Sequence, residues 1–169
     1  MELTGLKIFF DDSLLSAYEI AYPLLRKCNV PKILSIVCYG VDGGVSTWRP
    51  IGKPVMTLDQ VKEMMSNGWE IASHTFTHRY LTELTWDEVI LEVVGSKQWI
   101  ENNLGITPRW FVPPFGGKFT TQPIHDLVLQ NYEFGRLGCE YRDSIFHDIV
   151  EEGIEKELFY KLLKELDGK

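Results

Sequence analysis

Four residues in the first half of the chain have the types and spacing of a divalent-metal site. Asp11 and Asp12 are adjacent acids, and His74 and His78 are separated by three residues. Neutral imidazole and carboxylate together suit zinc and similar ions, and two histidines with one carboxylate leave open positions for water and substrate. A second carboxylate outside the coordination shell can take a proton from the bound water. The pattern therefore indicates a metal-dependent hydrolase.

Each of these residues also has an ordinary explanation. Asp12 with Ser13 could cap the helix that follows them. Two histidines four residues apart occur by chance on surfaces and in cores, and the intervening Thr-Phe-Thr lacks the glutamate of the zinc metalloprotease pattern. His147 taken alone is more often a core or turn histidine, and His125 has no expected role.

The predicted secondary structure brings the acids and histidines to one edge of a sheet. Short apolar segments predict strands, and apolar residues at helical spacing predict the helices between them. Such alternation indicates a parallel sheet with outer helices, whose active residues lie in loops at the carboxyl ends of the strands. Asp11 and Asp12 follow the first strand, the histidine pair follows the third, and His147 follows the last. The predicted strands are 6–10, 33–39, 69–72, 109–112, 133–135 and 143–146, and the predicted helices are 14–27, 57–67, 85–103, one from 121 and a closing one over 154–166.

The length of the chain limits the architecture. A complete eight-unit (β/α) barrel usually needs about 250 residues. With 169 residues, the chain predicts an α/β fold in the form of a deformed or incomplete (β/α) barrel, with mostly parallel strands and outer helices in one domain over residues 1–169. The sequences Thr57-Leu-Asp-Gln60 and Thr85-Trp-Asp-Glu88 fit the capping box and predict two of the helix starts.

Composition narrows the expected partners. The net charge of -7 argues against a nucleic-acid partner, because phosphate binding needs clustered Lys and Arg. The sequence has no transmembrane span and no leader pattern, so we expect no membrane partner and a cytoplasmic location. Three cysteines without close spacing predict reduced thiols rather than disulfides or a cysteine-rich zinc site.

Longer stretches of sequence resemble one known family. The run GWEIASHTFTHRYLTEL, with LGITPRWFVPPFGG after a long helix, is similar to the polysaccharide deacetylase family, also called carbohydrate esterase family four or the NodB-homology domain. The sequence FFDDS stands where the family has Thr-Phe-Asp-Asp-Gly, and SIFHDI resembles its final Leu-x-His motif. The resemblance covers most of residues 6–150.

The resemblance implies a role for each of the four residues. It makes Asp11 the catalytic base and makes Asp12, His74 and His78 the ligands of a divalent metal, with Zn²⁺ favoured and Co²⁺, Mn²⁺ or Ni²⁺ as alternatives. The implied substrate is an acetylated sugar or polysaccharide, from which acetyl groups on nitrogen or oxygen are removed. A catalytically degenerate protein that binds metal and glycan, or a hydrolase of a non-sugar carbon–nitrogen bond, are the alternative functions.

Further residues complete the implied site. His147 is the expected acid that protonates the leaving group, and a backbone amide near Phe115, after Pro114, is expected to stabilise the oxyanion. Ile145 is expected to line the pocket for the acetyl methyl group. A homo-oligomer is possible, because a second chain could supply missing groups.

The sequence departs from the family at two motifs. Val112 stands where the family has an arginine that contacts the base, and we find no counterpart of the family's Asp-Trp motif before His147. Arg136, Arg142 or Asp143 could substitute from new positions. Without a substitute, the base would depend on the neighbouring metal and on burial alone.

The first motif also differs. Ser13 replaces its glycine. Trp48 and Trp110 could stack on a sugar ring, although tryptophan at such positions more often packs in the core or in loops.

Overall fold

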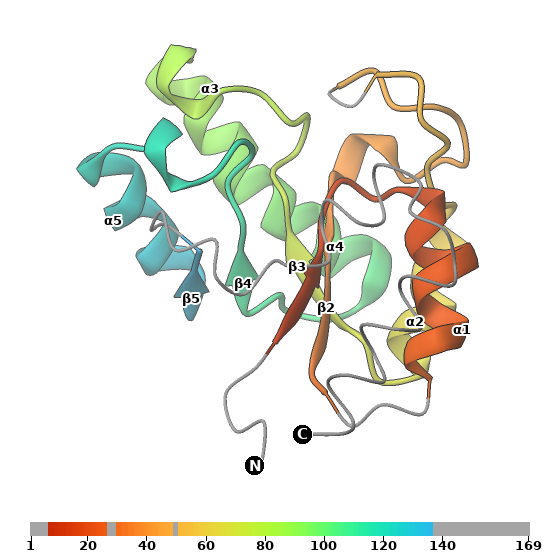
Figure 1. The fold of residues 1–169 in the computed structure, drawn as a ribbon. Coiled ribbons are helices and arrows are strands. Elements are labelled where there is room, and N and C mark those ends of the chain that lie inside the picture. The colour runs from red at the N-terminus through yellow and green to blue at the C-terminus, as the bar shows by residue number, and fades with distance from the viewer. Residues whose placement is uncertain (1–6, 27–29, 49–50, 137–169) are drawn as a thin grey trace.

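The computed structural model describes residues 7–26, 30–48 and 51–136, which form a sheet with helices around it (Figure 1). The five strands follow one another in chain order across the sheet, and every neighbouring pair is parallel. The sheet curls into half of a barrel, so the predicted incomplete (β/α) barrel is confirmed. The strands are β1 (Ile8–Phe10), β2 (Lys32–Ile36), β3 (Glu70–Ser73), β4 (Trp110–Phe111) and β5 (Phe134–Gly135).

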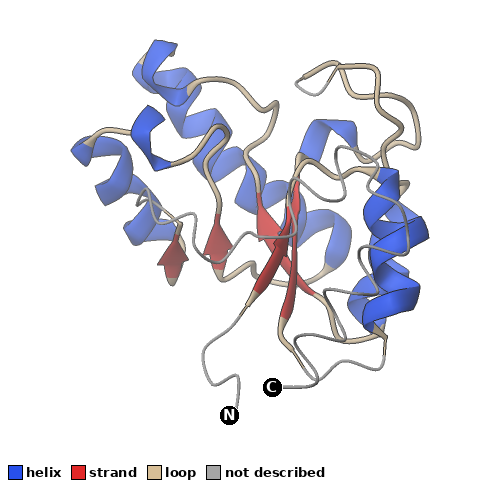
Figure 2. Ribbon diagram, in the orientation of Figure 1, coloured by secondary structure: helices blue, strands red, loops and turns tan. Residues whose placement is uncertain are grey.

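Helices connect the strands and lie around the sheet. In the view of Figure 2, α1 and α2 lie to the right of the strands, and α5 lies to the left. The longest helical stretch has a π-helical segment, Leu91–Gly95, between two α-helical parts. The helices are α1 (Tyr22–Leu25, after a π-helical Ala17–Ala21), α2 (Leu58–Ser66), α3 (Trp86–Ile90), α4 (Ser96–Leu104) and α5 (Gln122–Asn131).

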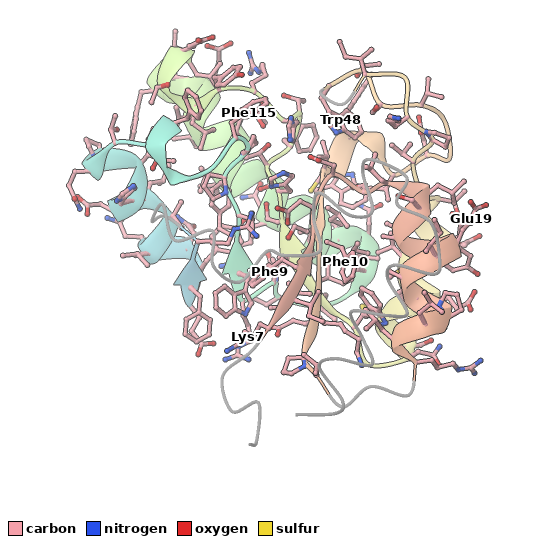
Figure 3. The ribbon with its side chains drawn as sticks, in the orientation of Figure 1. Lys7, Phe9, Phe10, Glu19, Trp48 and Phe115 are labelled. Carbon is pink, nitrogen blue, oxygen red and sulfur yellow. The ribbon has the colours of Figure 1, made fainter. Side chains whose placement is uncertain are left out.

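The first three strands are buried on both faces, which explains why β1 reads as an unbroken apolar run. Alternate residues of a strand point to opposite faces, and Figure 3 shows Phe9 and Phe10 on the two sides of β1. Phe10 packs with the helices in the larger core cluster. Phe9 packs with Ile33, Ala72 and Val112 on the concave face. The carboxyl ends of the strands are therefore fixed from both sides.

The boundaries of the predicted helices 57–67 and 85–103 agree closely with the structure. Both capping boxes form: Thr57 with Gln60 caps α2, and Thr85 with Glu88 caps α3. The long helix ends at Gly105, whose φ of 68° gives the left-handed cap that glycine favours.

The second strand was predicted to be longer than it is. β2 ends at Ile36, and a 3₁₀ turn over Cys38–Gly40 follows it. The backbone N–H groups of Cys38 and Tyr39 donate to the carbonyls of Thr75 and Phe76, at 3.2 and 2.9 Å, respectively. The chain leaves the strand ladder because these hydrogen bonds attach it to the loop that carries the two histidines.

The predicted strand 143–146 and the predicted helix 154–166 lie outside the described residues. Within the part of the chain that the structure describes, no helix is both long and apolar enough to cross a bilayer. Cys38 is a buried free thiol, as expected for a small apolar residue, and burial raises its pKa.

Candidate metal centre

A tight turn at the end of β1 fixes Asp11 and Asp12. Asp12 and Ser13 both have positive φ, 68° and 57°, a conformation that non-glycine residues adopt at an energetic cost. Ser13 is fully buried, its hydroxyl accepts the N–H of Val37 at 2.8 Å, and its carbonyl accepts the N–H of Met56 at 2.9 Å. These bonds explain how serine can stand where the resembled motif has glycine.

Asp12 faces the two histidines. Its carboxylate oxygen Oδ1 lies 2.7 Å from Nε2 of His78 and 3.2 Å from Nε2 of His74. The π-helical segment that follows has Ser16 at its N-cap position, and the Ser16 side chain makes no capping hydrogen bond. The helix-cap alternative does not account for the contacts of Asp12 with the two imidazole rings.

The loop after β3 holds the two histidines in fixed orientations. The backbone N–H of His74 donates to the carbonyl of Ile36 at 2.8 Å, which extends the β2–β3 pairing by one bond. The N–H of His78 donates to the hydroxyl of Thr75 at 3.0 Å. The two rings lie edge to face, 4.8 Å apart. The loop therefore brings both Nε2 atoms to the same carboxylate.

The carbonyl of Val112 determines the tautomer of His74. Nδ1 of His74 lies 2.7 Å from this oxygen, and a carbonyl can only accept, so Nδ1 carries the proton. In the neutral ring, Nε2 then presents a lone pair to the Asp12 carboxylate. A protein group bonded in this way to the far nitrogen is the usual support of a metal-ligating histidine.

These donor atoms fit a divalent cation. Two acceptors, Nε2 of His74 and Oδ1 of Asp12, face each other at 3.2 Å, an arrangement that requires a proton or a cation between them. His78 can donate a proton to the same oxygen in the metal-free protein, and a cation replaces that proton on binding. The three residues are 3–6% exposed, and their ligand atoms lie within 4.8 Å of one another. Asp12, His74 and His78 therefore have the composition and geometry of a divalent-metal site.

Asp11 has an arginine partner after all. Nη2 of Arg136, which directly follows β5, lies 2.6 Å from Oδ2 of Asp11, and the guanidinium also lies over the ring of Phe9, at 5.1 Å. Phe111 aligns with Gly135 in the β4–β5 pairing, so Val112 and Arg136 follow at neighbouring positions on adjacent strands. Asp11 therefore has a charged partner besides the metal site, as expected if an arginine from a new position substitutes for the one that Val112 replaces. Of the three possible substitutes, the structure brings Arg136 to Asp11, and Arg142 and Asp143 lie outside the described residues.

A cavity of about 310 Å³ opens beside His78. The ring of Phe115 lies 4.9 Å from that of His78 and stacks on Tyr80 at 3.8 Å. Trp48 forms another part of the wall, and Figure 3 shows Trp48 and Phe115 beyond the carboxyl ends of the strands. The remaining lining residues are Thr47, Ile51, Arg79, Glu83 and Leu84.

The remaining residues that were expected at the site lie in different places. Pro114 is buried directly before Phe115, while Ile145 and His147 lie outside the described residues. Trp110 is not at the cavity, because it packs between Phe9 and Phe134 at centroid distances of 5.4 and 4.5 Å.

The structure brings two further residues, Tyr80 and Glu92, to the site, and no sequence motif had predicted a role for either of them. Tyr80 forms a wall of the cavity, and Glu92 is a fully buried carboxylate beneath the histidine loop. The signal for Glu92 is its position in the helix. It lies on the same face as Val89 and Ser96, where an apolar residue is expected. Tyr80 had no comparable signal.

Comparisons with known sequences agree with the geometry. The sequence model described as Polysaccharide deacetylase matches residues 5–134. The chain is 36% identical over 73 residues to chitin deacetylase 1 of Cryptococcus neoformans, covering 42% of this chain and 15% of that protein. It is 34% identical over 100 residues to the putative polysaccharide deacetylase YxkH of Bacillus subtilis, covering 56% of this chain and 31% of that protein.

Solved structures share the fold. The Streptococcus pyogenes deacetylase PplD, in complex with acetate, gives a TM-score of 0.64 at 25% identity, with 74% of this chain and 52% of that chain covered. The BpsB deacetylase domain of Bordetella bronchiseptica gives 0.63 at 23% identity, with 76% and 62% covered. The chain thus spans less than two thirds of each of these four relatives.

The donor set predicts that each chain binds one divalent ion through His78. Replacing His78→Ala should weaken Zn²⁺ binding by at least about 100-fold, since even residues that only support ligands contribute about 10 to 100-fold. Isothermal titration and metal analysis measure this. The matched control is His125→Ala, because His125 contacts Thr120 rather than the triad. Equal affinity of His78→Ala and wild type would contradict the assignment.

The burial of His78 predicts a pH dependence of stability. Burial lowers the pKa of His78, although its hydrogen bond to Asp12 acts in the opposite direction. The unfolded chain, with a histidine pKa of about 6.5, then binds more protons than the folded chain at mildly acidic pH. The free energy of unfolding of the metal-free protein should therefore fall as the pH decreases below about 6.5. Urea unfolding after EDTA treatment, at about pH 7.5 and 5.5, should show a smaller difference for His78→Gln than for wild type. An identical pH dependence in both would refute the prediction.

Proposed function

The chain belongs to the polysaccharide deacetylase family, and from this premise we propose that it is a metal-dependent hydrolase that removes acetyl groups from N- or O-acetylated sugars or polysaccharides. The observation that carries the proposal is the buried triad of Asp12, His74 and His78, with Asp11 next to it at the end of β1. Family membership suggests the type of reaction. The triad adds the residues that could bind the metal that this reaction needs.

Each residue of the triad has a stated part in holding the metal. Asp12 provides a carboxylate oxygen, and His74 and His78 provide Nε2. The bound ion, Zn²⁺ in our proposal with Co²⁺, Mn²⁺ or Ni²⁺ as alternatives, supplies Lewis acidity toward the acetyl carbonyl and acidifies the attacking water. Val112 supports this arrangement through its carbonyl, which keeps the proton of His74 on Nδ1.

Asp11 is the proposed base. It accepts the proton of the attacking water, for which it must be ionised and correctly oriented. The bond from Arg136 supports both conditions, because a guanidinium favours the charged carboxylate and occupies one of its two oxygens, Oδ2.

The residues beyond Pro114 have proposed roles in stabilising the oxyanion, in protonating the leaving group and in binding the acetyl methyl group. The backbone amide at Phe115 donates to the acetyl oxygen as negative charge develops there. Support comes from the position of Phe115 at the cavity wall, where its ring lies 4.9 Å from that of His78. His147 protonates the leaving nitrogen or oxygen, and Ile145 lines the space for the acetyl methyl group.

The cavity supports a sugar as the substrate. Its walls combine aromatic rings, from Trp48, Tyr80 and Phe115, with polar side chains, from Arg79 and Glu83. Sugar rings have apolar faces and hydroxyl edges, so such a mixture matches them better than a purely apolar pocket would. Its position next to His78 would place an acetyl group at the metal.

One observation favours a second candidate, a protein that binds metal and glycan without turnover. Val112 replaces the arginine of the resembled family motif. Arg136 weakens this alternative, because it supplies the missing contact to Asp11 from the next strand. Metal-dependent acetate release from any acetylated sugar would exclude the alternative.

The base role predicts a large loss of activity in Asp11→Asn. Acetate release from a panel of N- and O-acetylated sugars should fall by about 10²- to 10⁴-fold, the usual contribution of a general base. Zn²⁺ binding should persist, because Asp11 is not part of the triad. The exposed Asp59, in the first turn of α2, provides the control Asp59→Asn. Unchanged acetate release by Asp11→Asn would refute the mechanism.

The Arg136–Asp11 pair predicts a change in kcat rather than in KM. Arg136→Gln removes the charge that orients the base, so kcat should fall by about 10 to 100-fold with KM within a few-fold. Arg109→Gln is the matched control, since Arg109 forms a similar pair with Glu133 on the surface. Steady-state kinetics decides the matter: a kcat equal to that of wild type would show that the pair is structural only.

A further inference from the structure

The loop that carries His74 and His78 has an unfavourable backbone conformation. Thr75 and His78 have φ values of 69° and 62°, and neither is glycine. Such residues persist only where surrounding groups determine the conformation. Because His78 is itself one of the strained residues, whatever holds the loop also sets the position of a metal ligand.

Glu92 binds the middle of this loop through its carboxylate. Its Oε2 accepts the backbone N–H of Phe76 at 2.9 Å and the backbone N–H of Thr77 at 2.8 Å. Its Oε1 accepts the hydroxyl of Thr77 and the Nε–H of Arg79 at 3.3 Å. Three of these four donors come from the segment between the two histidines, so one carboxylate fixes the middle of the loop.

Glu92 differs in burial from the acids that form ordinary ion pairs on the surface. It belongs to the π-helical segment Leu91–Gly95 and is 0% exposed. π-helical insertions are often found at functional sites, and a buried carboxylate is stable only when its hydrogen bonds are satisfied. Glu88, which also pairs with Arg79, has a 41% exposed side chain and contacts Thr85 rather than the loop.

We propose that Glu92 is a positioning residue of the metal centre, which sets the distance of His78 from His74 and Asp12 by binding the loop amides. The proposal rests on the metal site of the proposed function and not on any hydrolytic activity. It assigns Glu92 no contact with metal or substrate. Its effect is on metal affinity, because a ligand displaced from the common point no longer shares the ion with the other two.

The variant Glu92→Gln tests the chemistry of this contact with little change in shape. A glutamine oxygen can still accept the amides of Phe76 and Thr77, but its NH₂ group then faces the Nε–H of Arg79, a donor against a donor. We expect the Zn²⁺ affinity, measured by competition with a chromogenic chelator near neutral pH, to fall by about 10 to 100-fold. Glu88→Gln is the matched control and should remain within about twofold of wild type.

A purely structural role of Glu92 is distinguished by measuring affinity on folded protein. Circular dichroism and thermal unfolding without metal establish that each variant is folded. A folded Glu92→Gln that binds Zn²⁺ as tightly as wild type overturns the proposal. If Glu92→Gln does not fold, Thr77→Val decides, because it removes only the hydroxyl donor: a several-fold weaker affinity supports the proposal, and an unchanged affinity overturns it.

The test of Glu92 can succeed or fail independently of the proposed function. Zinc affinity is measured without substrate. A wild type that binds Zn²⁺ but releases no acetate contradicts the deacetylase proposal, while the ratio of affinities between wild type and Glu92→Gln still decides the role of Glu92.

Discussion

The arrangement of the site follows from one close contact, in which two imidazole nitrogens and a carboxylate oxygen meet at one buried point. Nε2 of His74 and Nε2 of His78 both lie within 3.2 Å of Oδ1 of Asp12. Nε2 of His74 and Oδ1 of Asp12 are both acceptors, and such atoms at 3.2 Å repel unless a proton or a cation lies between them. The surrounding hydrogen bonds, from Ser13 beneath Asp12 to the Val112 carbonyl behind His74, hold the atoms in this unfavourable proximity. A bound cation would remove the repulsion between Nε2 of His74 and Oδ1 of Asp12.

The curvature of the sheet brings Arg136 to the second acid, Asp11. β1 and β5 are the two edges of the described sheet, yet Asp11 after β1 and Arg136 after β5 form an ion pair at 2.6 Å. The pair spans the concave face, where the guanidinium also covers the ring of Phe9. In a flat five-stranded sheet the two edges would lie roughly 19 Å apart, since neighbouring strands are about 4.8 Å from each other. The half-barrel shape is therefore what lets one chain supply both Asp11 and the arginine that holds it.

Much of this arrangement could be predicted from the sequence, and the limits have physical causes. The adjacent acids and the histidine pair indicated a metal site because their residue types have a narrow chemistry and because they follow predicted parallel strands. The family resemblance then implied which residues, Asp12, His74 and His78, are the ligands. The capping boxes at Thr57 and Thr85 were predictable because they depend on residues three apart. The partner of Asp11 could not be chosen among three candidates, because 125 residues separate it from Arg136 and the contact depends on sheet curvature.

Asp12, His74 and His78 should together hold one divalent ion. Anomalous diffraction at the zinc absorption edge, from crystals of the Zn²⁺-loaded protein, can locate that ion. We expect one strong peak per chain, with Nε2 of both histidines and a carboxylate oxygen of Asp12 each about 2.0–2.2 Å away. A peak at any other group of residues, or none at the triad in a fully loaded crystal, would contradict this expectation.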